Sequence, residues 1–204
     1  MIVLPRLYAI LDAGLLAASE NLLSAATELV SAGCTLLQYR NKSGNARVIL
    51  EQGRAVRKLV GDRARLIMND RADLCLAAGF DGVHVGQDDL SPEAVRQIIG
   101  PERWLGVSTH NAEQLREADL TSVDYMAIGP VFSTSSKDRP DPVVGVDGVR
   151  RARGLTRKPL VAIGGITRAN AASVIEAGAD SVAVISDLLR EPRKSAEAFL
   201  SILG

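Results

Sequence analysis

Two aspartates that follow neighbouring apolar runs are the residues whose type and spacing point most directly to chemistry. Asp70 comes soon after the apolar run 66–68, and Asp89 follows the run 82–85. Residues 72–78 between them have the pattern of a helix, so the segment forms a strand, a helix and a strand. Parallel neighbouring strands lie about 5 Å apart, so both carboxylates can share a hard cation. The sequence therefore predicts a magnesium site, unless Asp70 caps the helix and Asp89 is a solvated loop acid.

Three polar side chains alternate at the end of another predicted strand. Gln38, Arg40 and Lys42 lie at and beyond the end of the strand 35–39. Residues two apart on an extended chain point the same way, so one amide and two cations can reach a single ligand. The pattern is typical of a polyphosphate site, and a solvated strand end is the alternative interpretation.

Small residues follow the last two predicted strands. Gly164 and Gly165 follow the strand 160–163, and Ser186 follows the strand 181–185. Glycine lets backbone N–H groups approach an anion, and the start of a following helix adds its dipole. The two loops predict a phosphate site, with tight turns as the alternative.

The segment 129–145, GPVFSTSSKDRPDPVVG, is the longest irregular stretch of the chain. A loop of this length in a compact domain is usually a lid or a binding loop, and we expect its closure to exclude water. Its Thr134, Ser135, Ser136 and Lys137 form either an anion clamp or a flexible polar linker.

The two histidines have different predicted settings. His84 lies between Val83 and Val85 in a strand and points opposite to both, so we expect it inside the protein with a satisfied hydrogen bond. His110 follows another strand, close to Ser108, and is either an acid or base or an ordinary loop residue.

The composition describes one ordinary domain with small-molecule partners. The chain has 204 residues, of which 47% are hydrophobic and 24% charged, with 24 basic and 24 acidic side chains. A formal charge of zero gives no electrostatic footprint for nucleic acid or an anionic membrane. Cys34 and Cys75 lie in apolar settings, which predicts free thiols in a reducing compartment. The chain shows no signal peptide and no apolar run that could span a bilayer, so we expect a cytoplasmic protein.

Apolar strands and helical patterns alternate along the whole chain. The predicted strands are residues 8–11, 35–39, 66–68, 82–85, 104–107, 125–128, 160–163 and 181–185, and helices of 15–32 and 188–203 are among those expected between and after them. Similar junctions, AGFD at 78–81 and AGAD at 177–180, support this count. The pattern predicts an α/β fold, a (β/α)8 TIM barrel with residues 1–204 as a single domain. A doubly wound sheet is the alternative, but the first turn lacks its glycines.

Several linked motifs resemble the thiamine-phosphate synthase family, also called thiamine-phosphate pyrophosphorylase. The motifs are GCTLLQYRNK, LIMNDRADLCLAAGFDGVHVGQDDL, WLGVSTHN, DYMAIGPVFSTSSK, VAIGGI and ADSVAVIS, between about Arg6 and Leu189. The family is a (β/α)8 barrel that joins 4-amino-2-methyl-5-hydroxymethylpyrimidine diphosphate to a thiazole phosphate, and it releases thiamine phosphate and pyrophosphate. The resemblance implies a transferase that depends on Mg²⁺, and it is compatible with a homodimer.

The resemblance also implies a role for each matched residue. Asp70 and Asp89 would hold Mg²⁺, and the implied catalytic residues are Arg40, Lys42, Ser108 and Lys137. The residues implied to bind the pyrimidine diphosphate are Gln38, Arg40, Lys42, Asn69, Ser108 and Lys137, with Tyr39 and Asn41 beside them. Those implied to bind the thiazole phosphate are Thr134, Ser135, Ser136, Gly165, Ile185 and Ser186.

The implied reaction needs no protein nucleophile. Mg²⁺ and the cationic side chains stabilise the departing diphosphate, and the thiazole nitrogen attacks the exocyclic carbon. Asn41 stands where the usual motif, Gln-x-Arg-Glu-Lys, has glutamate, and we expect activity to be retained because asparagine still forms hydrogen bonds.

Two other functions compete with this interpretation. One is the thiazole tautomerase relative on the same barrel, in which His110 falls at the position of a catalytic histidine. The other is a sensor that binds thiazole phosphate without turnover. Asn69, Asp70 and Asp89 favour the synthase, because neither rival requires a metal bound to a diphosphate.

Overall fold

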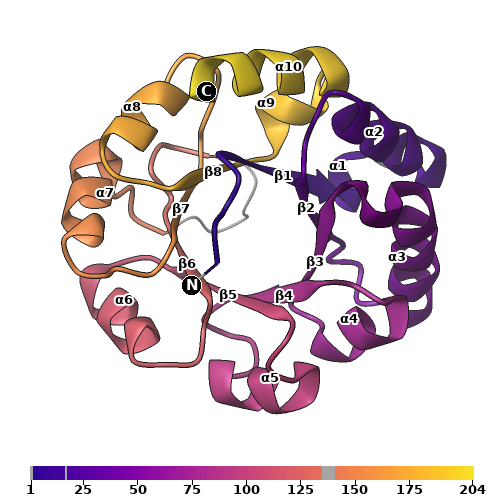
Figure 1. Ribbon diagram of the computed structural model, residues 1–204, viewed down its shortest axis with the longest axis horizontal. Helices are drawn as coiled ribbons and strands as arrows, with labels where there is room; N and C mark the ends of the chain where they lie inside the picture. The colour runs from indigo at the N-terminus through magenta and orange to yellow at the C-terminus, as the bar shows by residue number, and fades with distance from the viewer. Residues whose placement is uncertain (1, 17, 135–140) are drawn as a thin grey trace.

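Eight parallel strands close into a barrel that is surrounded by helices (Figure 1). The computed structural model describes residues 2–16, 18–134 and 141–204. The strands in barrel order are β1 (Leu7–Asp12), β2 (Leu36–Arg40), β3 (Arg65–Asn69), β4 (Gly82–Val85), β5 (Trp104–Thr109), β6 (Tyr125–Ile128), β7 (Leu160–Ile163) and β8 (Ser181–Val184). Because β1 also pairs with β8, the sheet has no free edge. The predicted (β/α)8 barrel is confirmed.

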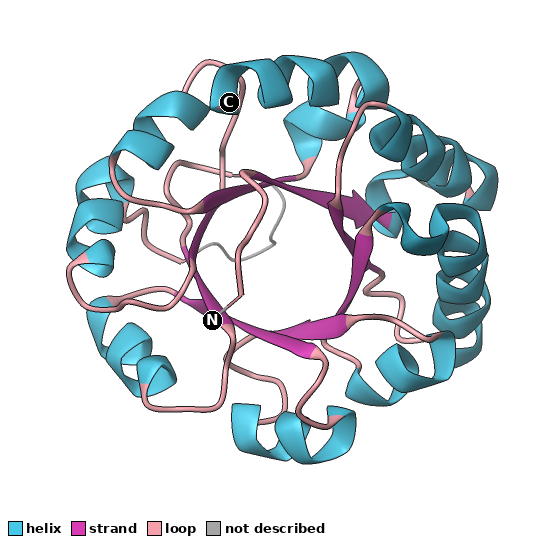
Figure 2. Cartoon of the chain, in the orientation of Figure 1, coloured by secondary structure: helices cyan, strands magenta, loops and turns pink. Residues whose placement is uncertain are grey.

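The helices form an outer ring around the strands (Figure 2). They are α1 (Ala13–Leu16), α2 (Ser19–Ser31), α3 (Ala46–Val60), α4 (Ala72–Ala78), α5 (Pro92–Ile99), α6 (Ala112–Asp119), α7 (Gly145–Arg153), α8 (Ala171–Glu176), α9 (Ser186–Leu189) and α10 (Pro192–Leu203), with a 3₁₀ helix η1 (Gly61–Arg63) after α3. None of the helices in the described ranges is long and apolar enough to cross a membrane.

Two long predicted helices are each divided into two. The predicted helix 15–32 is interrupted at Ala18, whose backbone is extended with φ −115° and ψ 144°. The predicted helix 188–203 is interrupted before Pro192, which begins α10, a position where proline needs no backbone N–H. Both predictions of a single helix were therefore wrong.

The barrel has apolar side chains on both faces of its strands. The larger cluster lies between the strands and the helices, and a smaller one fills the barrel interior. The interior cluster includes Tyr8, Ile10, Ile67 and Tyr125, and Leu4 from the N-terminal segment joins it. Because side chains fill the interior, ligands can be bound only at an end of the barrel.

A repeated contact between aspartate and arginine fixes the starts of three strand pairs. In each, an aspartate just before an even-numbered strand accepts a hydrogen bond from a backbone N–H near the start of the preceding strand. The same aspartate accepts a second hydrogen bond from an arginine in the helix that comes before the odd-numbered strand of the pair. The sets are Asp81 with Leu66 and Arg57, Asp124 with Leu105 and Arg96, and Asp180 with Leu160 and Arg153. Two of these aspartates end the AGFD and AGAD junctions.

Replacing Asp124 with alanine is expected to destabilise the barrel by about 2–4 kcal/mol, because two charge-assisted hydrogen bonds are lost. These bonds join Asp124 Oδ2 to the Leu105 N–H at 2.8 Å and to an Arg96 nitrogen at 2.7 Å. Urea unfolding measures the change. The control is Asp62→Ala, which removes an exposed aspartate and is expected to cost less than about 0.5 kcal/mol. Equal stability of the two variants would contradict a structural role for the contact.

Candidate active site

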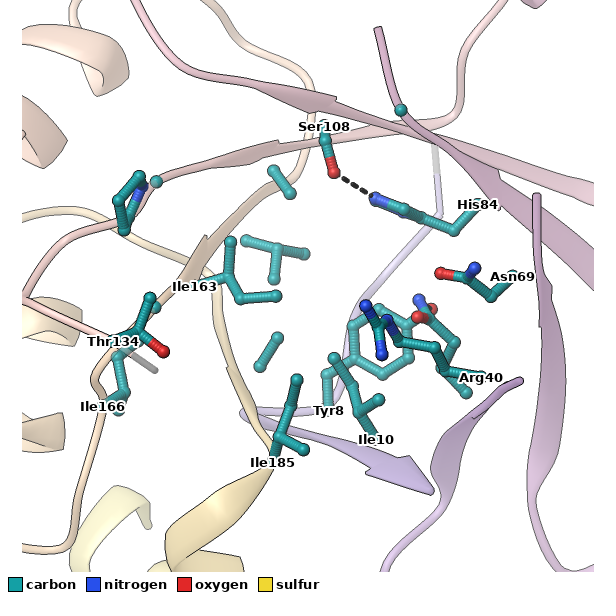
Figure 3. A pocket seen from close by; sticks show the side chains of 18 of the residues that line it. Tyr8, Ile10, Arg40, Asn69, His84, Ser108, Thr134, Ile163, Ile166 and Ile185 are labelled. Carbon is teal, nitrogen blue, oxygen red and sulfur yellow. Dashed lines mark hydrogen bonds between the residues drawn. The ribbon is translucent and has the colours of Figure 1, made fainter. Parts of the chain in front are cut away.

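A cavity of about 1100 Å³ opens at the C-terminal ends of the strands (Figure 3). Residues of β1 and residues at or beyond the ends of the other seven strands line it. Figure 3 shows Ile163, Ile166 and Ile185 on one side, together with Thr134, and Asn69, Arg40 and His84 on the other side, where Ile10 also lies. The cavity therefore offers an apolar wall and a polar wall to a ligand.

Asp70 occupies a special backbone position at the end of β3. Its φ is 62°, and among the described residues it is the one non-glycine residue with a positive φ. The Asp70 N–H donates to the carbonyl oxygen of His84 at 2.8 Å. Arg71 is the N-cap residue of α4 and provides no side-chain cap. The alternative in which Asp70 caps this helix is therefore not supported, and its carboxylate faces the cavity.

Asp70 lies between a lysine and a second carboxylate. Lys42 forms an ion pair with the Asp70 carboxylate. Burial raises the pKa of the Asp70 carboxyl, Lys42 lowers it, and the charge of Asp89 raises it again, with a net increase. Asp89 also lines the cavity, and its Oδ2 accepts a hydrogen bond from the Gly86 N–H at 2.7 Å. Two carboxylates therefore lie close enough to interact, and Lys42 pairs with one of them.

The donor atoms fit a hard cation such as Mg²⁺. Carboxylate oxygens are the ligands that Mg²⁺ prefers, and it commonly keeps one or two protein carboxylates with water or phosphate oxygens. Within residues 2–16, 18–134 and 141–204, no group of three or more histidine, cysteine, aspartate or glutamate side chains could hold a metal. A cation between Asp70 and Asp89 would therefore take its other ligands from water and substrate.

Gln38 and Arg40 of β2 and Lys42 just after it all line the cavity, as their spacing predicts. Arg40 forms an ion pair with Asp12, whose side chain is only 7% exposed. Asp12 Oδ1 also accepts hydrogen bonds from the backbone N–H groups of Gly14 and Leu15, at 2.9 and 3.2 Å. Asp12 therefore holds the guanidinium of Arg40 in place, a contact that the sequence analysis missed.

The side chains of Tyr39 and Asn41 point away from the cavity. The Tyr39 hydroxyl donates to Gln52 Oε1 at 2.6 Å, and Asn41 Nδ2 donates to the same oxygen at 2.9 Å. Asn41 Oδ1 also accepts a bond from the Ser43 N–H at 2.9 Å. Neither residue lines the cavity, so the binding role expected for them stays a prediction that only their backbone groups could fulfil. Asn41 therefore orders the loop after β2 and does not replace a charge in the cavity.

The loops after β7 and β8 meet at one side of the cavity. Gly165, Ile185, Ser186 and Thr134 all line it. Gly165 has φ 64°, and a Cβ there would lie 2.5 Å from the carbonyl oxygen of Ser133, so only glycine fits. Ser135, Ser136 and Lys137 lie outside the described residues.

An ion pair and one further cation complete the β7–β8 side. The Arg168 backbone N–H and Nε both donate to Asp187 Oδ2, at 3.0 and 3.1 Å, which ties the two loops together. Arg190 is exposed, lines the cavity, and was missed by the sequence analysis. A basic residue shortly after Ser186 was its only signal in the sequence.

A buried chain of hydrogen bonds joins Gln38 to Ser108. Gln38 Nε2 donates to the Tyr8 hydroxyl at 2.9 Å, and the hydroxyls of Tyr8 and Tyr125 lie 3.0 Å apart. The Tyr125 hydroxyl lies 3.1 Å from His84 Nδ1, and His84 Nε2 lies 2.9 Å from Ser108 Oγ (Figure 3). Burial lowers the pKa of His84 to about 4, so its ring is neutral at pH 7. The expected interior position of His84 is confirmed, whereas the two tyrosines were not foreseen.

His110 lies at the rim of the same cavity. Its Nδ1 is 2.6 Å from the carbonyl oxygen of Gly129, and its Nε2 is 3.4 Å from Asp141 Oδ2. Because a carbonyl oxygen can only accept a hydrogen bond, Nδ1 of His110 carries a proton. His110 thus connects the ends of β5 and β6.

The fold and the cavity define a TIM barrel with a polar cavity at the C-terminal ends of its strands, where enzymes of this fold bind their substrates. A sequence model of the family described as thiamine monophosphate synthase matches residues 7–188. The chain belongs to this thiamine-phosphate synthase family, and it is an enzyme of the transferase class.

Individual relatives agree with the family assignment. The thiamine-phosphate synthase of Koribacter versatilis is 60% identical over 203 residues, which cover 98% of this chain and 96% of that protein. The thiamine-phosphate synthase of Moorella thermoacetica is 43% identical over 161 residues, which cover 78% of this chain and 77% of that protein. The solved structure of thiamine phosphate pyrophosphorylase from Pyrococcus furiosus superposes with a TM-score of 0.86 at 32% identity, covering 97% of this chain and 95% of that one. These relatives support the synthase and give no support to the tautomerase or the sensor.

Proposed function

We propose that the polar wall of the cavity binds the pyrimidine diphosphate and that the β7–β8 side binds the thiazole phosphate. The observation that carries this proposal is that the charged side chains of the cavity form two groups on opposite sides of it. Arg40, Lys42, Asp70 and Asp89 lie on the β2–β4 side, where a diphosphate with a bound cation needs them. Arg190 and the glycine loop lie on the β7–β8 side, where a single phosphate can be held.

The residues that we assign to Mg²⁺ are Asp70 and Asp89. When bound, Mg²⁺ supplies positive charge that stabilises the oxygens of the leaving diphosphate. Lys42 pairs with Asp70, so its ammonium group lies beside the proposed Mg²⁺ position. From there it can also contact the diphosphate. The Mg²⁺ assignment is supported by the all-oxygen donor set and by the interaction between the two carboxylates, Asp70 and Asp89.

The protein's own side chains position the substrates and stabilise charge. As the bond between the exocyclic carbon and the diphosphate oxygen breaks, the diphosphate takes the electron pair, and the thiazole nitrogen forms the new bond to carbon. Arg40 and Lys42 stabilise the negative charge that develops on the diphosphate, and Ser108 donates a hydrogen bond to it. Asn69 Nδ2 is buried and has no hydrogen-bond partner in the described part of the chain, which leaves it to a substrate. The role expected for Lys137 stays a prediction.

The test is to mix the purified protein with both substrates, with and without Mg²⁺, and to follow thiamine phosphate by mass spectrometry. We expect product only when Mg²⁺ is present. Product formed equally in excess EDTA would contradict the metal assignment. Tight thiazole phosphate binding without any product would contradict the assignment of the polar wall to the pyrimidine diphosphate.

Arg190→Ala is expected to raise the KM for the thiazole phosphate about tenfold and to leave the KM for the pyrimidine diphosphate unchanged. The reason is that Arg190 is a cation on the β7–β8 side of the cavity. Steady-state kinetics with each substrate varied in turn measures the two values. Arg193→Ala is the matched control, because Arg193 pairs with Glu197 on α10 and does not line the cavity. An equal effect on both substrates would show that Arg190 does not recognise the thiazole phosphate.

We also propose that residues 1–204 form one domain that acts in the cytoplasm as a homodimer. Support for a reducing location comes from Cys34 and Cys75, which are both buried free thiols.

For the homodimer, exposed apolar side chains such as Leu120 and Ile98 are available for a contact between subunits. Sedimentation equilibrium tests the dimer.

A further inference from the structure

The hydrogen-bond chain from Gln38 to Ser108 has two ends in the cavity and three members inside the barrel. Both end residues line the cavity, and Tyr8 and His84 also reach its wall, whereas Tyr125 lies wholly inside the barrel with 0% of its surface exposed. The side chains come from β1, β2, β4, β5 and β6, so the chain crosses the barrel interior. Purely apolar packing could fill this space, and five polar groups arranged in sequence therefore call for another explanation.

The amide of Gln38 sets the direction of every bond in the chain. Gln38 Nε2 can only donate, so the Tyr8 oxygen accepts and the Tyr8 proton is directed to Tyr125. The Tyr125 oxygen has then accepted one bond, and its proton is directed to Nδ1 of His84. A neutral imidazole that accepts at Nδ1 carries its proton at Nε2 and donates it to Ser108.

We propose that Tyr8, Tyr125 and His84 are positioning residues whose one-way hydrogen-bond chain presents the carbonyl oxygen of Gln38 and the hydroxyl proton of Ser108 to the substrate. Gln38 Oε1 receives no hydrogen bond within the described part of the chain, and with the proton of His84 on Nε2 the Ser108 hydroxyl accepts that bond and keeps its own proton for a ligand. The cavity therefore has a fixed acceptor at one point and a fixed donor at another.

This pair of groups selects a particular ligand chemistry. The Gln38 carbonyl oxygen accepts an N–H from an amino group, and the Ser108 hydroxyl donates to an anionic oxygen. An aminopyrimidine that carries a diphosphate has both features, and this step rests on the proposed function. A ring with a carbonyl oxygen in place of the amino group would bring two acceptors together, and rotation of the Gln38 amide could relieve this only if every hydrogen bond of the chain reversed its direction.

Close packing holds the rings in place, so that only the protons can change direction. The ring centroids of His84 and Tyr125 lie 5.5 Å apart, and those of Tyr8 and Tyr125 lie 6.1 Å apart in an edge contact. Gly106 makes this packing possible, because a Cβ there would lie 2.1 Å from the Tyr125 ring and 2.5 Å from His84 Nδ1. The backbone of β5 therefore leaves room for the contact between His84 and Tyr125.

The tautomer of His84 is the direct readout of the proposal. Long-range ¹⁵N NMR distinguishes a protonated Nε2 from a protonated Nδ1 in each histidine. The chain has two histidines, and His110→Asn removes one set of signals and so assigns them. At pH 7 we expect the Nε2–H form for His84, and for His110 a proton on Nδ1, which faces a carbonyl oxygen. An Nδ1–H form of His84 in the unmodified protein would overturn the proposed direction.

Gln38→Glu tests whether the chain transmits its direction. An ionised carboxylate can only accept, so Tyr8 must donate to it, Tyr125 must donate to Tyr8, and His84 must donate from Nδ1. We therefore expect Gln38→Glu to switch His84 to the Nδ1–H form, although the two residues are linked only through two tyrosine hydroxyls. Tyr125→Phe breaks the chain, and in this background Gln38→Glu should leave the His84 signals unchanged. A merely structural core would show no switch in either background, and that result would overturn the proposal.

Kinetics then tests whether the fixed groups matter for substrate. Tyr125→Phe keeps the ring, and we expect it to raise the KM for the pyrimidine diphosphate about tenfold with the KM for the thiazole phosphate unchanged. An unchanged KM for both, after the tautomers have behaved as expected, would overturn the positioning role. If the unmodified protein fails to bind the pyrimidine diphosphate at all, the proposed function fails, and the NMR results on the free protein still decide the direction of the chain.

Discussion

Asp70→Asn is expected to lower kcat by about 10²–10³-fold, because it removes one of the two carboxylates assigned to Mg²⁺. Asparagine is the informative replacement for two reasons. It has nearly the same size as aspartate, and it tolerates the left-handed backbone at φ 62° equally well. The change therefore removes charge without adding backbone strain. Steady-state rates at saturating concentrations of both substrates, over a range of Mg²⁺ concentrations, measure the effect.

Stability provides a second prediction for the same variant. The pKa of the Asp70 carboxyl is raised in the folded protein, mainly by burial, so at pH 7 the ionised carboxylate lowers stability relative to a neutral group. Below the pKa that the Asp70 carboxyl has in the unfolded chain, this loss of stability is absent. It grows as the pH rises through the higher pKa of the same carboxyl in the folded protein. Asp70→Asn should therefore unfold at the same or a higher urea concentration than the unmodified protein. A large loss of activity would then have a chemical cause and would not reflect unfolding.

Asp88→Asn is the matched control. Asp88 lines the same cavity beside Asp89, but no metal role is assigned to it. We expect its kcat to stay within about threefold of the unmodified value, as for most exposed substitutions. Equal losses for Asp70→Asn and Asp88→Asn would show that the loop responds to net charge alone. An unchanged kcat for Asp70→Asn at every Mg²⁺ concentration would contradict the metal site.

The barrel could be predicted from the sequence because each strand is a short apolar run that stops at a polar residue or at glycine. The strand Gly82–Val85 was predicted with the bounds that the structure shows. Helix breaks were harder, because residues 15–32 keep helical apolar spacing across Ala18. Pro192 was a signal that the last helix begins anew, and it could have been used.

The site could be predicted only where it depends on contacts within one strand or between sequential strands. Gln38 and Arg40 share a face because they are two residues apart. Tyr8 and Tyr125 are 117 residues apart, and their contact depends on the register of a closed barrel. Spacing along the sequence does not supply that register. The available signal was general: a buried tyrosine hydroxyl needs a hydrogen-bond partner.

Arg40→Met is expected to lower kcat/KM for the pyrimidine diphosphate by about 10²–10³-fold and to cost about 3–5 kcal/mol of stability. The stability loss arises because Asp12, with a side chain 7% exposed, is left without the cation that pairs with it. The activity loss arises because a guanidinium that lines the cavity is removed. Urea unfolding and steady-state kinetics measure the two losses separately.

Adding Asp12→Asn to Arg40→Met separates the two effects. An amide at position 12 can still accept the backbone N–H groups of Gly14 and Leu15, and it leaves no unpaired buried charge. We therefore expect the double variant to recover most of the lost stability and none of the lost activity. If activity returned together with stability, Arg40 would act only by balancing the charge of Asp12. Continued loss of activity in a stable barrel would instead require that the guanidinium itself contacts the diphosphate.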